Sequence, residues 1–333
     1  DKKYIGPTRV RYGIEHSMNV LAVKTLTDYV GETESYDYLL NFGFTTLSED
    51  DKYSQAKALG GITNGVYNIE MTAAYAAIAN GGTYTKPILY TQVLDHDGNV
   101  LLDNTTPETH EVLKDSTAYL LTSAMEDVVN GAGGTGGSAR LSNMPVAAKT
   151  GTSQESRDLW ISAFTPYYTA SVWGGYDEHK TMDRLSQSWH QKLWKNIMEH
   201  IQDTKGLEYK DFEIPSSVEE KTVCTKTGLL ATSSCPAITE YFSKDNAPTK
   251  SCSGHYVAPS KDSKKDDSES SDENTPATGT DSSGTTSSPD SSSAGTTTEP
   301  AAGGDSAGTT GTTTGDTSGS TTGGDTGSGS TTQ

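Results

Sequence analysis

The chain has 333 residues, a formal net charge of −19 and a hydrophobic content of 32%, well below the roughly 45–50% of an average soluble domain. The chain is acidic and has no cluster of lysine and arginine, which argues against nucleic acid or anionic lipid as a partner. No apolar run approaches the roughly 18 residues of a membrane span, and no signal peptide is apparent.

Residues 9–30 are predicted to form two helical pieces separated by residues 16–19. In the second piece, apolar side chains recur close to the 3.6-residue period of a helix, at Val20, Val23, Leu26 and Val30. Gly31 follows as a stop signal. A short side-chain oxygen can accept hydrogen bonds from the free N–H groups at the start of a helix, so Ser17 and Asn19 are first interpreted as helix caps.

The middle of the chain is predicted to contain two further helices and a hairpin. These elements are an alanine-rich helix over 68–79, a hairpin over 93–102, an amphipathic helix over 116–129 capped by Ser116, and a glycine-rich loop over 130–137. The many alanines of the first helix indicate close packing on other elements. In the hairpin, Asp97-Gly98 supplies the positive φ that a tight turn needs.

Three strands and a closing helix follow. The strands are predicted over 146–152, 159–165 and 169–176, with turn-forming residues between them. Along the closing helix, apolar residues step in strides of four, at Trp189, Leu193, Ile197 and Ile201. Helices before and after an antiparallel run of strands predict a mixed α/β (α+β) fold, with an antiparallel sheet flanked by helices.

Residues 206–257 are predicted to form a small C-terminal extension with short strands and the chain's three cysteines. Cys224, Cys235 and Cys252 lack the CxxC spacing of a zinc site, so we expect no metal there. One disulfide plus an odd thiol, in an exported protein, is the predicted arrangement, with three free thiols as the open alternative.

Residues 258–333 are predicted to be a disordered tail rich in Ser, Thr, Gly and Asp. From Ser260 onward the only residues of the hydrophobic class are five alanines, and twelve acidic residues oppose three lysines. Such a segment cannot bury enough apolar area to offset the roughly 1–2 kcal/mol per residue that backbone ordering costs.

The sharpest local signal is Lys149-Thr150-Gly151-Thr152, at the end of an apolar strand. The lysine places a positive charge beside two hydroxyls, and the glycine lacks a side chain that would keep a ligand from lying along the strand edge. This edge suits an extended peptide that ends in a carboxylate, held by charge-assisted hydrogen bonds and strand addition. A solvated lysine beside a turn is the alternative, since Lys-Thr-Gly recurs at 226–228.

A second signal is Ser17-Met18-Asn19. A hydroxyl and an amide two residues apart can move a proton and orient a substrate amide. His16 lies beside Ser17 but lacks an evident acid partner for a triad, so we expect it on a helix surface.

In order and approximate spacing, the Ser-x-Asn and Lys-Thr-Gly-Thr motifs resemble the second and third motifs of penicillin-binding transpeptidases and serine β-lactamases. Further stretches resemble the transpeptidase domain, at 60–66, 70–71, 74–84, 134–136 with Ala139, and 157–160. Residues 227–252 resemble the end of bifunctional class A penicillin-binding proteins, and the tail fits their Gram-positive members. The resemblance implies the serine β-lactamase/transpeptidase-like fold.

The resemblance also implies acyl transfer on a peptidoglycan stem peptide ending in D-Ala-D-Ala. A nucleophilic serine in a Ser-x-x-Lys motif attacks the penultimate carbonyl, and the amine of a second stem peptide resolves the acyl-enzyme. Ser17 would relay a proton to the departing amine, Asn19 would hold the substrate amide, and Lys149 would stabilise charge around Ser17 and the substrate carboxylate. The Thr150 and Thr152 hydroxyls would bind that carboxylate, and the Thr152 N–H would form half of the oxyanion hole.

By this resemblance, residues 1–205 form an N-terminally truncated transpeptidase domain, followed by the extension and the tail. The chain's Ser-x-x-Lys, at 54–57, follows Ser-x-Asn, whereas the family's nucleophile precedes it, so we interpret Ser54 as a decoy. The chain begins at Asp1 without a methionine, so we expect a processed or truncated piece. From the resemblance we expect the nucleophile, the first strands, a glycosyltransferase domain and a membrane anchor upstream. The piece alone is predicted to expose apolar surface, to be poorly stable and to be inactive.

The expected partners are peptidoglycan stem peptides, their lipid-linked precursor and β-lactam antibiotics, at the extracellular face of the cell membrane or in the wall. No cofactor is expected, and membrane contact is expected only through the missing anchor. Two alternatives stay open. One is a D-Ala-D-Ala carboxypeptidase or β-lactamase-like hydrolase on the same fold, which needs a water-activating carboxylate. The other is a non-catalytic cell-wall surface protein whose tail is a disordered stalk.

Overall fold

The computed structural model describes residues 5–178, 180–182 and 186–255. The chain divides into two units, residues 1–261 and 262–333, and every element named below belongs to the first. The predicted disordered tail, 258–333, lies outside the described residues. Within the described residues, no helix combines the length and apolarity that a membrane crossing requires.

The two helical pieces predicted for residues 9–30 are confirmed as α1 (Val10–Glu15) and α2 (Asn19–Thr25), and a π-helical turn at Leu26–Val30 extends α2. The predicted helix cap is wrong. Met18 occupies the N-cap position of α2 and makes no side-chain cap hydrogen bond. Ser17 instead forms the tight turn between the helices with a φ of 52°, which directs its hydroxyl to a partner far along the chain.

Three helices lead from α2 towards the sheet. They are α3 (Glu32–Asn41), the short α4 (Glu49–Lys52) and α5 (Asn68–Ala79). The last has the predicted bounds and buries Ala73, Ala74, Ala77 and Ile78, which confirms the close packing that its alanines indicate.

A pair of two-stranded ribbons and a long helix follow α5. β1 (Thr83–Thr85) pairs with β4 (Thr109–Glu111), and β2 (Gln92–Leu94) pairs with β3 (Val100–Asp103) as the predicted hairpin. The predicted helix is confirmed as α6 (Asp115–Asn130), but Ser116 is not its cap. The helix begins one residue earlier than predicted, so Ser116 lies in its first turn, where its N–H donates to the Asp115 carboxylate at 2.6 Å.

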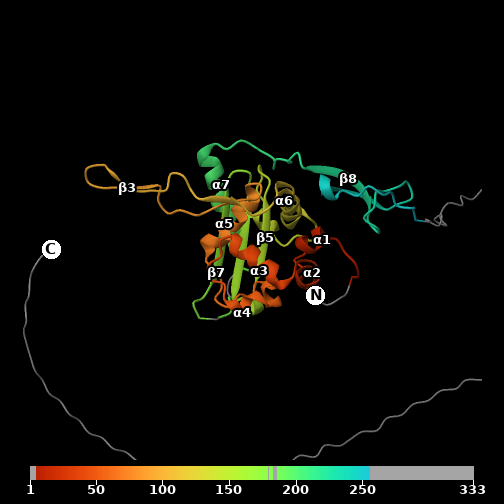
Figure 1. Ribbon diagram of the computed structural model, residues 1–333, viewed down its shortest axis with the longest axis horizontal. Helices are drawn as coiled ribbons and strands as arrows, with labels where there is room; N and C mark the ends of the chain where they lie inside the picture. The colour runs from red at the N-terminus through yellow and green to blue at the C-terminus, as the bar shows by residue number, and fades with distance from the viewer. Residues whose placement is uncertain (1–4, 179, 183–185, 256–333) are drawn as a thin grey trace, which may run out of the picture. The chain divides into compact units, whose positions relative to one another are not determined.

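The three predicted strands are confirmed as β5 (Ala147–Thr152), β6 (Asp158–Phe164) and β7 (Thr169–Gly175), antiparallel and in that order. One face of this sheet packs on α7 (Trp189–Lys205), and the other packs on α5 and α6 (Figure 1). The first interface contains Ala148, Ile161, Ala163, Trp194 and Met198, and the second contains Ile78, Met125, Ala147 and Phe164. The flanked antiparallel sheet is therefore confirmed.

The buried face of α7 is displaced by one residue from the predicted apolar stripe. Leu193 and Ile197 of that stripe are each 42% exposed, whereas Trp194 and Met198 lie in the core. The indole N–H of Trp194 donates to the Ala170 carbonyl of β7 at 3.1 Å, which fixes this face of the helix against the sheet.

Some large apolar side chains and strand edges are exposed among the described residues. Among the described strands β5 and β7 each pair with β6 alone, so both edges of the three-stranded sheet are unpaired. Large apolar side chains exposed elsewhere include Val10, Val20 and Leu59. The predicted low stability of the piece stays a prediction.

The extension contains a two-stranded ribbon, β8 (Val218–Cys224) with β9 (Ala237–Ser243), which packs beside α6 (Figure 1). The predicted disulfide is wrong, since Cys224, Cys235 and Cys252 are all free thiols in the structure. Separate segments of the extension bring all three sulfurs to one point together with His255, where none of them is paired with another.

Arg11 links β9 of the extension to α6 through hydrogen bonds, and we expect Arg11→Ala to make local opening of the β8–β9 ribbon easier. Its Nε donates to Glu240 at 2.8 Å and its Nη1 to Asp127 at 3.0 Å, with the side chain 18% exposed. Loss of these charged hydrogen bonds should cost about 2 kcal/mol, which corresponds to roughly 30-fold faster hydrogen exchange of the β8 and β9 amides. Arg9→Ala is the matched control, because Arg9 reaches Glu240 only at 3.4 Å and is 43% exposed. Equal exchange in the two variants would contradict this assignment.

Candidate active site

Lys149 of β5 and Ser17 of the turn before α2 are in direct contact. Lys149 Nζ donates a hydrogen bond to Ser17 Oγ at 2.7 Å and another to the Thr150 carbonyl at 2.9 Å. β5 is an edge strand, since among the described strands it pairs with β6 only. The two motifs therefore meet at the open edge of the sheet.

All six candidate site residues line one cavity of about 520 Å³, namely Ser17, Asn19, Lys149, Thr150, Gly151 and Thr152. A larger cavity of about 870 Å³ adjoins it and continues along β5 to Ser153. Both cavities share Tyr75 of α5 and the chain from Lys149 to Thr152. The residues of β5 thus line two cavities that share part of their walls.

Burial lowers the pKa of Lys149 to about 8. At neutral pH its ammonium group therefore stays largely charged, but it loses its proton more easily than an exposed lysine does. An ammonium group can only donate hydrogen bonds. The Ser17 oxygen accepts from it, which leaves the hydroxyl proton of Ser17 free to be donated to a group bound in the cavity.

The remaining residues of β5 shape the cleft. The hydroxyls of Thr150 and Thr135 share a hydrogen bond of 2.7 Å, which ties β5 to the glycine-rich loop after α6. Thr135 was not singled out by sequence reasoning, although it lies in one of the stretches that carry the resemblance. A Cβ on Gly151 would lie 3.2 Å from the Cβ of Trp160, on the wall of the larger cavity. Glycine there keeps that part of the cleft open.

Ser54 and Lys57 form a capped turn. Ser54 Oγ accepts from the Ala56 N–H at 3.2 Å, at the start of a 3₁₀ turn over Gln55–Leu59. The buried Lys57 ammonium donates to three backbone carbonyls, those of Asp51, Lys52 and Ser54. Neither side chain is among the described residues that line the two cavities.

Asp51 supports the wall of the cleft, a role that sequence reasoning missed. It is 2% exposed and accepts from the Thr63 N–H at 2.9 Å and the Thr63 hydroxyl at 2.7 Å. Burial by itself raises the pKa of Asp51, but its hydrogen bonds from Ser48 and Thr63 together lower that pKa to about 2. The Ser-x-x-Asp spacing from Ser48 is the signal that could have identified it, because it forms a capping box with α4.

His16 packs at the end of α1. Its ring stacks on Tyr12 with centroids 3.9 Å apart, and its Nδ1 lies 3.1 Å from the Tyr12 carbonyl oxygen. The described partner of the Ser17 hydroxyl is Lys149, so His16 takes no part in a triad with Ser17.

A carboxylate free to activate water is not found among the described residues that line the two cavities. Asp158 carries the one carboxylate of that set. Its two oxygens accept from the Trp173 indole at 3.1 Å and from the Ser153 hydroxyl at 2.9 Å. These hydrogen bonds fix the Asp158 carboxylate in the wall of the larger cavity.

Two protein families match the sequence. Residues 1–199 match the penicillin binding protein transpeptidase domain, and residues 214–256 match the penicillin-binding protein 1A C-terminal domain. Penicillin-binding protein 1A of Clostridium botulinum (strain Langeland) is 37% identical over 229 residues, which are 69% of this chain and 27% of that protein. Penicillin-binding protein 1A/1B of Bacillus subtilis (strain 168) is 31% identical over 274 residues, 75% of this chain and 29% of that protein. The chain thus spans less than a third of these relatives.

Solved structures share the fold. The crystal structure of penicillin-binding protein 1A from Haemophilus influenzae has a TM-score of 0.62 at 23% identity, covering 75% of this chain and 42% of that one. PonA1 from Mycobacterium tuberculosis in complex with penicillin V has a TM-score of 0.54 at 24% identity, covering 64% of this chain and 61% of that one.

Proposed function

The chain belongs to the penicillin-binding protein transpeptidase family, and on that premise we propose that it supplies the proton-relay and carboxylate-binding parts of a peptidoglycan-cross-linking DD-transpeptidase. The longer protein would be a bifunctional glycosyltransferase/transpeptidase of class A. The observation that carries the proposal is the 2.7 Å contact of Lys149 with Ser17, inside a cavity that all six motif residues line.

A stem peptide ending in D-Ala-D-Ala would lie along the free edge of β5. Its terminal carboxylate would meet the Lys149 charge and the hydroxyls of Thr150 and Thr152, while Asn19 would hold a substrate amide. Such an edge adds main-chain hydrogen bonds to the charge-assisted ones. β-Lactams, which also carry a carboxylate next to a reactive carbonyl, would occupy the same place.

In the reaction, the oxygen of a nucleophilic serine would bond to the penultimate carbonyl carbon as its proton passes to the lysine of the same Ser-x-x-Lys motif, and the C–N bond to the terminal D-alanine would break. The departing nitrogen takes a proton from Ser17, which Lys149 resupplies. The amine of a second stem peptide would then attack the ester carbon and give its proton back to Ser17 and Lys149. The ester C–O bond would break, and the serine oxygen would regain its proton from the lysine of its motif. The Thr152 N–H would donate to the developing oxyanion, a contact worth roughly 3–4 kcal/mol of barrier.

We place the nucleophile in a part of the longer protein outside residues 1–333. The Ser54 hydroxyl caps a turn, and the Lys57 ammonium group donates its hydrogen bonds to backbone carbonyls. We therefore propose that Ser54 is a decoy and that this chain is inactive alone. The glycosyltransferase domain and the membrane anchor would lie in the same missing part, with the active site at the extracellular face of the membrane.

The alternative hypothesis of a hydrolase requires a carboxylate that activates water. Asp158 does not suit that role, because both of its carboxylate oxygens already accept hydrogen bonds from protein groups. The alternative hypothesis of a non-catalytic surface protein gives no reason for the partly buried contact between Lys149 and Ser17. Product analysis of the longer protein separates the three functions. Cross-linked peptide dimers support a transpeptidase, released D-alanine without dimers indicates a carboxypeptidase, and no product indicates a surface protein.

Fluorescent penicillin should form no covalent adduct with the isolated 333-residue chain, because the nucleophile is absent. The longer protein, labelled under the same conditions, should carry one adduct per chain by intact mass. Labelling of the isolated chain would overturn the placement of the nucleophile.

A further inference from the structure

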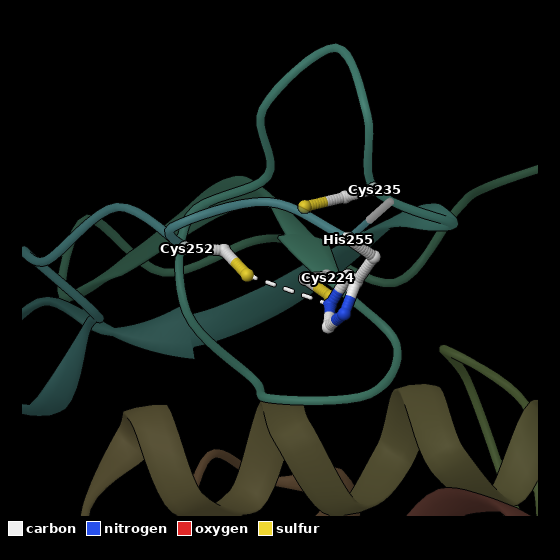
Figure 2. A group of neighbouring side chains, drawn as sticks. All are labelled: Cys224, Cys235, Cys252 and His255. Atoms are coloured by element: carbon white, nitrogen blue, oxygen red, sulfur yellow. Dashed lines mark hydrogen bonds between the residues drawn. The ribbon is translucent and has the colours of Figure 1, made fainter. Parts of the chain in front are cut away.

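Cys224, Cys235, Cys252 and His255 gather at one point of the extension, with their side chains directed towards one another (Figure 2). One ligand atom of each residue lies within 4.8 Å of the others. His255 Nε2 is 3.0 Å from Cys224 Sγ and 3.5 Å from Cys252 Sγ. Cys224 and Cys252 are buried, and the other two are half-buried.

Backbone hydrogen bonds of one segment position two of the cysteines. Cys224 ends β8, and its N–H donates to the Leu229 carbonyl at 2.8 Å. The Cys252 N–H donates to the Leu230 carbonyl at 2.8 Å, and the Leu230 N–H donates to the Lys250 carbonyl at 3.0 Å. One short segment therefore pairs with the backbone beside Cys224 and with the backbone beside Cys252, which brings the two cysteines close together.

Two turns bring in the other two side chains. The Cys235 N–H closes a turn on the Thr232 carbonyl at 2.9 Å. His255 follows Gly254, which has a φ of 91°. A Cβ at Gly254 would lie 2.5 Å from Ser234 Oγ, so only glycine lets this turn lie against the Cys235 turn.

We propose that Cys224, Cys235, Cys252 and His255 bind one Zn²⁺ ion in a closed structural site. Three thiolates and one imidazole are an established ligand set for structural zinc, and four protein ligands leave no open position for catalysis. With Zn–S near 2.3 Å and Zn–N near 2.0–2.1 Å, the ligand atoms of a tetrahedral site lie about 3.5–3.8 Å apart. The separations in the structure bracket these values, so small side-chain shifts would complete the site.

This proposal replaces the expectation of no metal. That expectation rested on the absence of a CxxC pair, but these ligands come from three segments that meet only in the fold. On binding, the three thiols release their protons to solvent, and the neutral imidazole donates its Nε2 lone pair.

The extension has a physical need for such a site. Among the described residues after 205, the buried hydrophobic side chains are Val218, Val223, Cys224 and Cys252. A module with so small a core gains stability from a metal that joins distant segments. Zinc would thereby fix β8, the Cys235 turn and residues 251–255 to one another.

The test is metal binding by the whole 333-residue chain, purified under reducing conditions without metal. We expect one zinc per chain after addition and dialysis. Co²⁺ in its place should give thiolate-to-cobalt charge-transfer bands and the intense visible bands of tetrahedral cobalt. Cys235→Ser and His255→Ala should each weaken Co²⁺ binding at least tenfold. His96→Ala is the control, because His96 is an exposed histidine of the distant hairpin turn and should bind as the original chain does.

X-ray absorption of the zinc-loaded chain tests the site even if a variant misfolds. Three sulfurs at about 2.3 Å and one nitrogen at about 2.0–2.1 Å support the proposal. A shell of oxygen and nitrogen ligands, unchanged zinc content in both variants, or a disulfide seen by intact mass in a chain that takes up no zinc would each overturn it. None of these readouts depends on penicillin binding, so the result stands apart from the proposed function.

Discussion

Replacing Lys149 with methionine should slow acylation of the longer protein by penicillin about 10³-fold. Under the proposed function, the variant removes the charge that would face the substrate carboxylate and the ammonium group that contacts Ser17 at 2.7 Å. Loss of one preorganised donor of this kind costs about 10²–10³-fold, and loss of the proton path adds to it. Stopped-flow measurement of the second-order acylation rate with a chromogenic β-lactam checks the prediction.

Lys226→Met is the matched control, since Lys226 begins the second Lys-Thr-Gly, in the extension. It is exposed and lines neither of the two site cavities among the described residues. Its acylation rate should stay within about twofold of the original protein. Equal losses in the two lysine variants would contradict a specific role for Lys149.

The same Lys149→Met variant should be more stable at neutral pH than the original protein. Burial lowers the pKa of Lys149 to about 8, from an ordinary value of 10.5, so keeping it charged in the fold costs free energy. Between those two values the unfolded chain binds more protons than the folded one, so stability due to Lys149 rises with pH through this window. The gain in unfolding free energy from Lys149→Met should therefore shrink between pH 7.5 and pH 10, as measured by urea denaturation.

Ser17→Gly should lower the acylation rate about 10²–10³-fold. Its hydroxyl is the group placed between Lys149 and the cavity, and positioned proton transfer contributes about 10²–10⁴-fold to a rate. Glycine tolerates the φ of 52° at this position, so the variant removes the hydroxyl without straining the turn.

Ser17→Ala provides the comparison for strain. Alanine also lacks the hydroxyl but disfavours the left-handed backbone, so it should lose as much activity and also some stability. Thermal unfolding separates the two effects. A Ser17→Gly protein that acylates within threefold of the original rate would show that the hydroxyl is not part of the proton path.

Local sequence patterns correctly predicted the helices and strands that such patterns largely determine. The bounds of α5 were predicted from an alanine-rich stretch, and the order of β5, β6 and β7 from strand-forming stretches separated by turn-forming residues. The buried face of α7 was placed one residue off, because the Trp194 contact with β7 is a tertiary one. Sequence pattern reports which side chains are apolar, and packing decides which of them are covered.

Motif order predicted which candidate site residues belong together, but it did not predict the residues that support the walls of the cavities. Ser17 and Lys149 were singled out together, and the structure brings them into contact. Local sequence rules predicted Ser17 as a helix cap, because a serine hydroxyl just before a helix can accept a hydrogen bond either from a helix N–H or from a distant lysine. Asp51 and the cysteine cluster escaped because their partners come from segments whose proximity only the fold creates.

Under the proposed function, this chain holds the proton relay of the active site and the nucleophile lies elsewhere in the longer protein. Peptide mapping of the longer protein after labelling with penicillin tests it most directly. We predict that the modified serine lies in a Ser-x-x-Lys sequence outside residues 1–333. An adduct on Ser54, or on Ser17, would contradict the account.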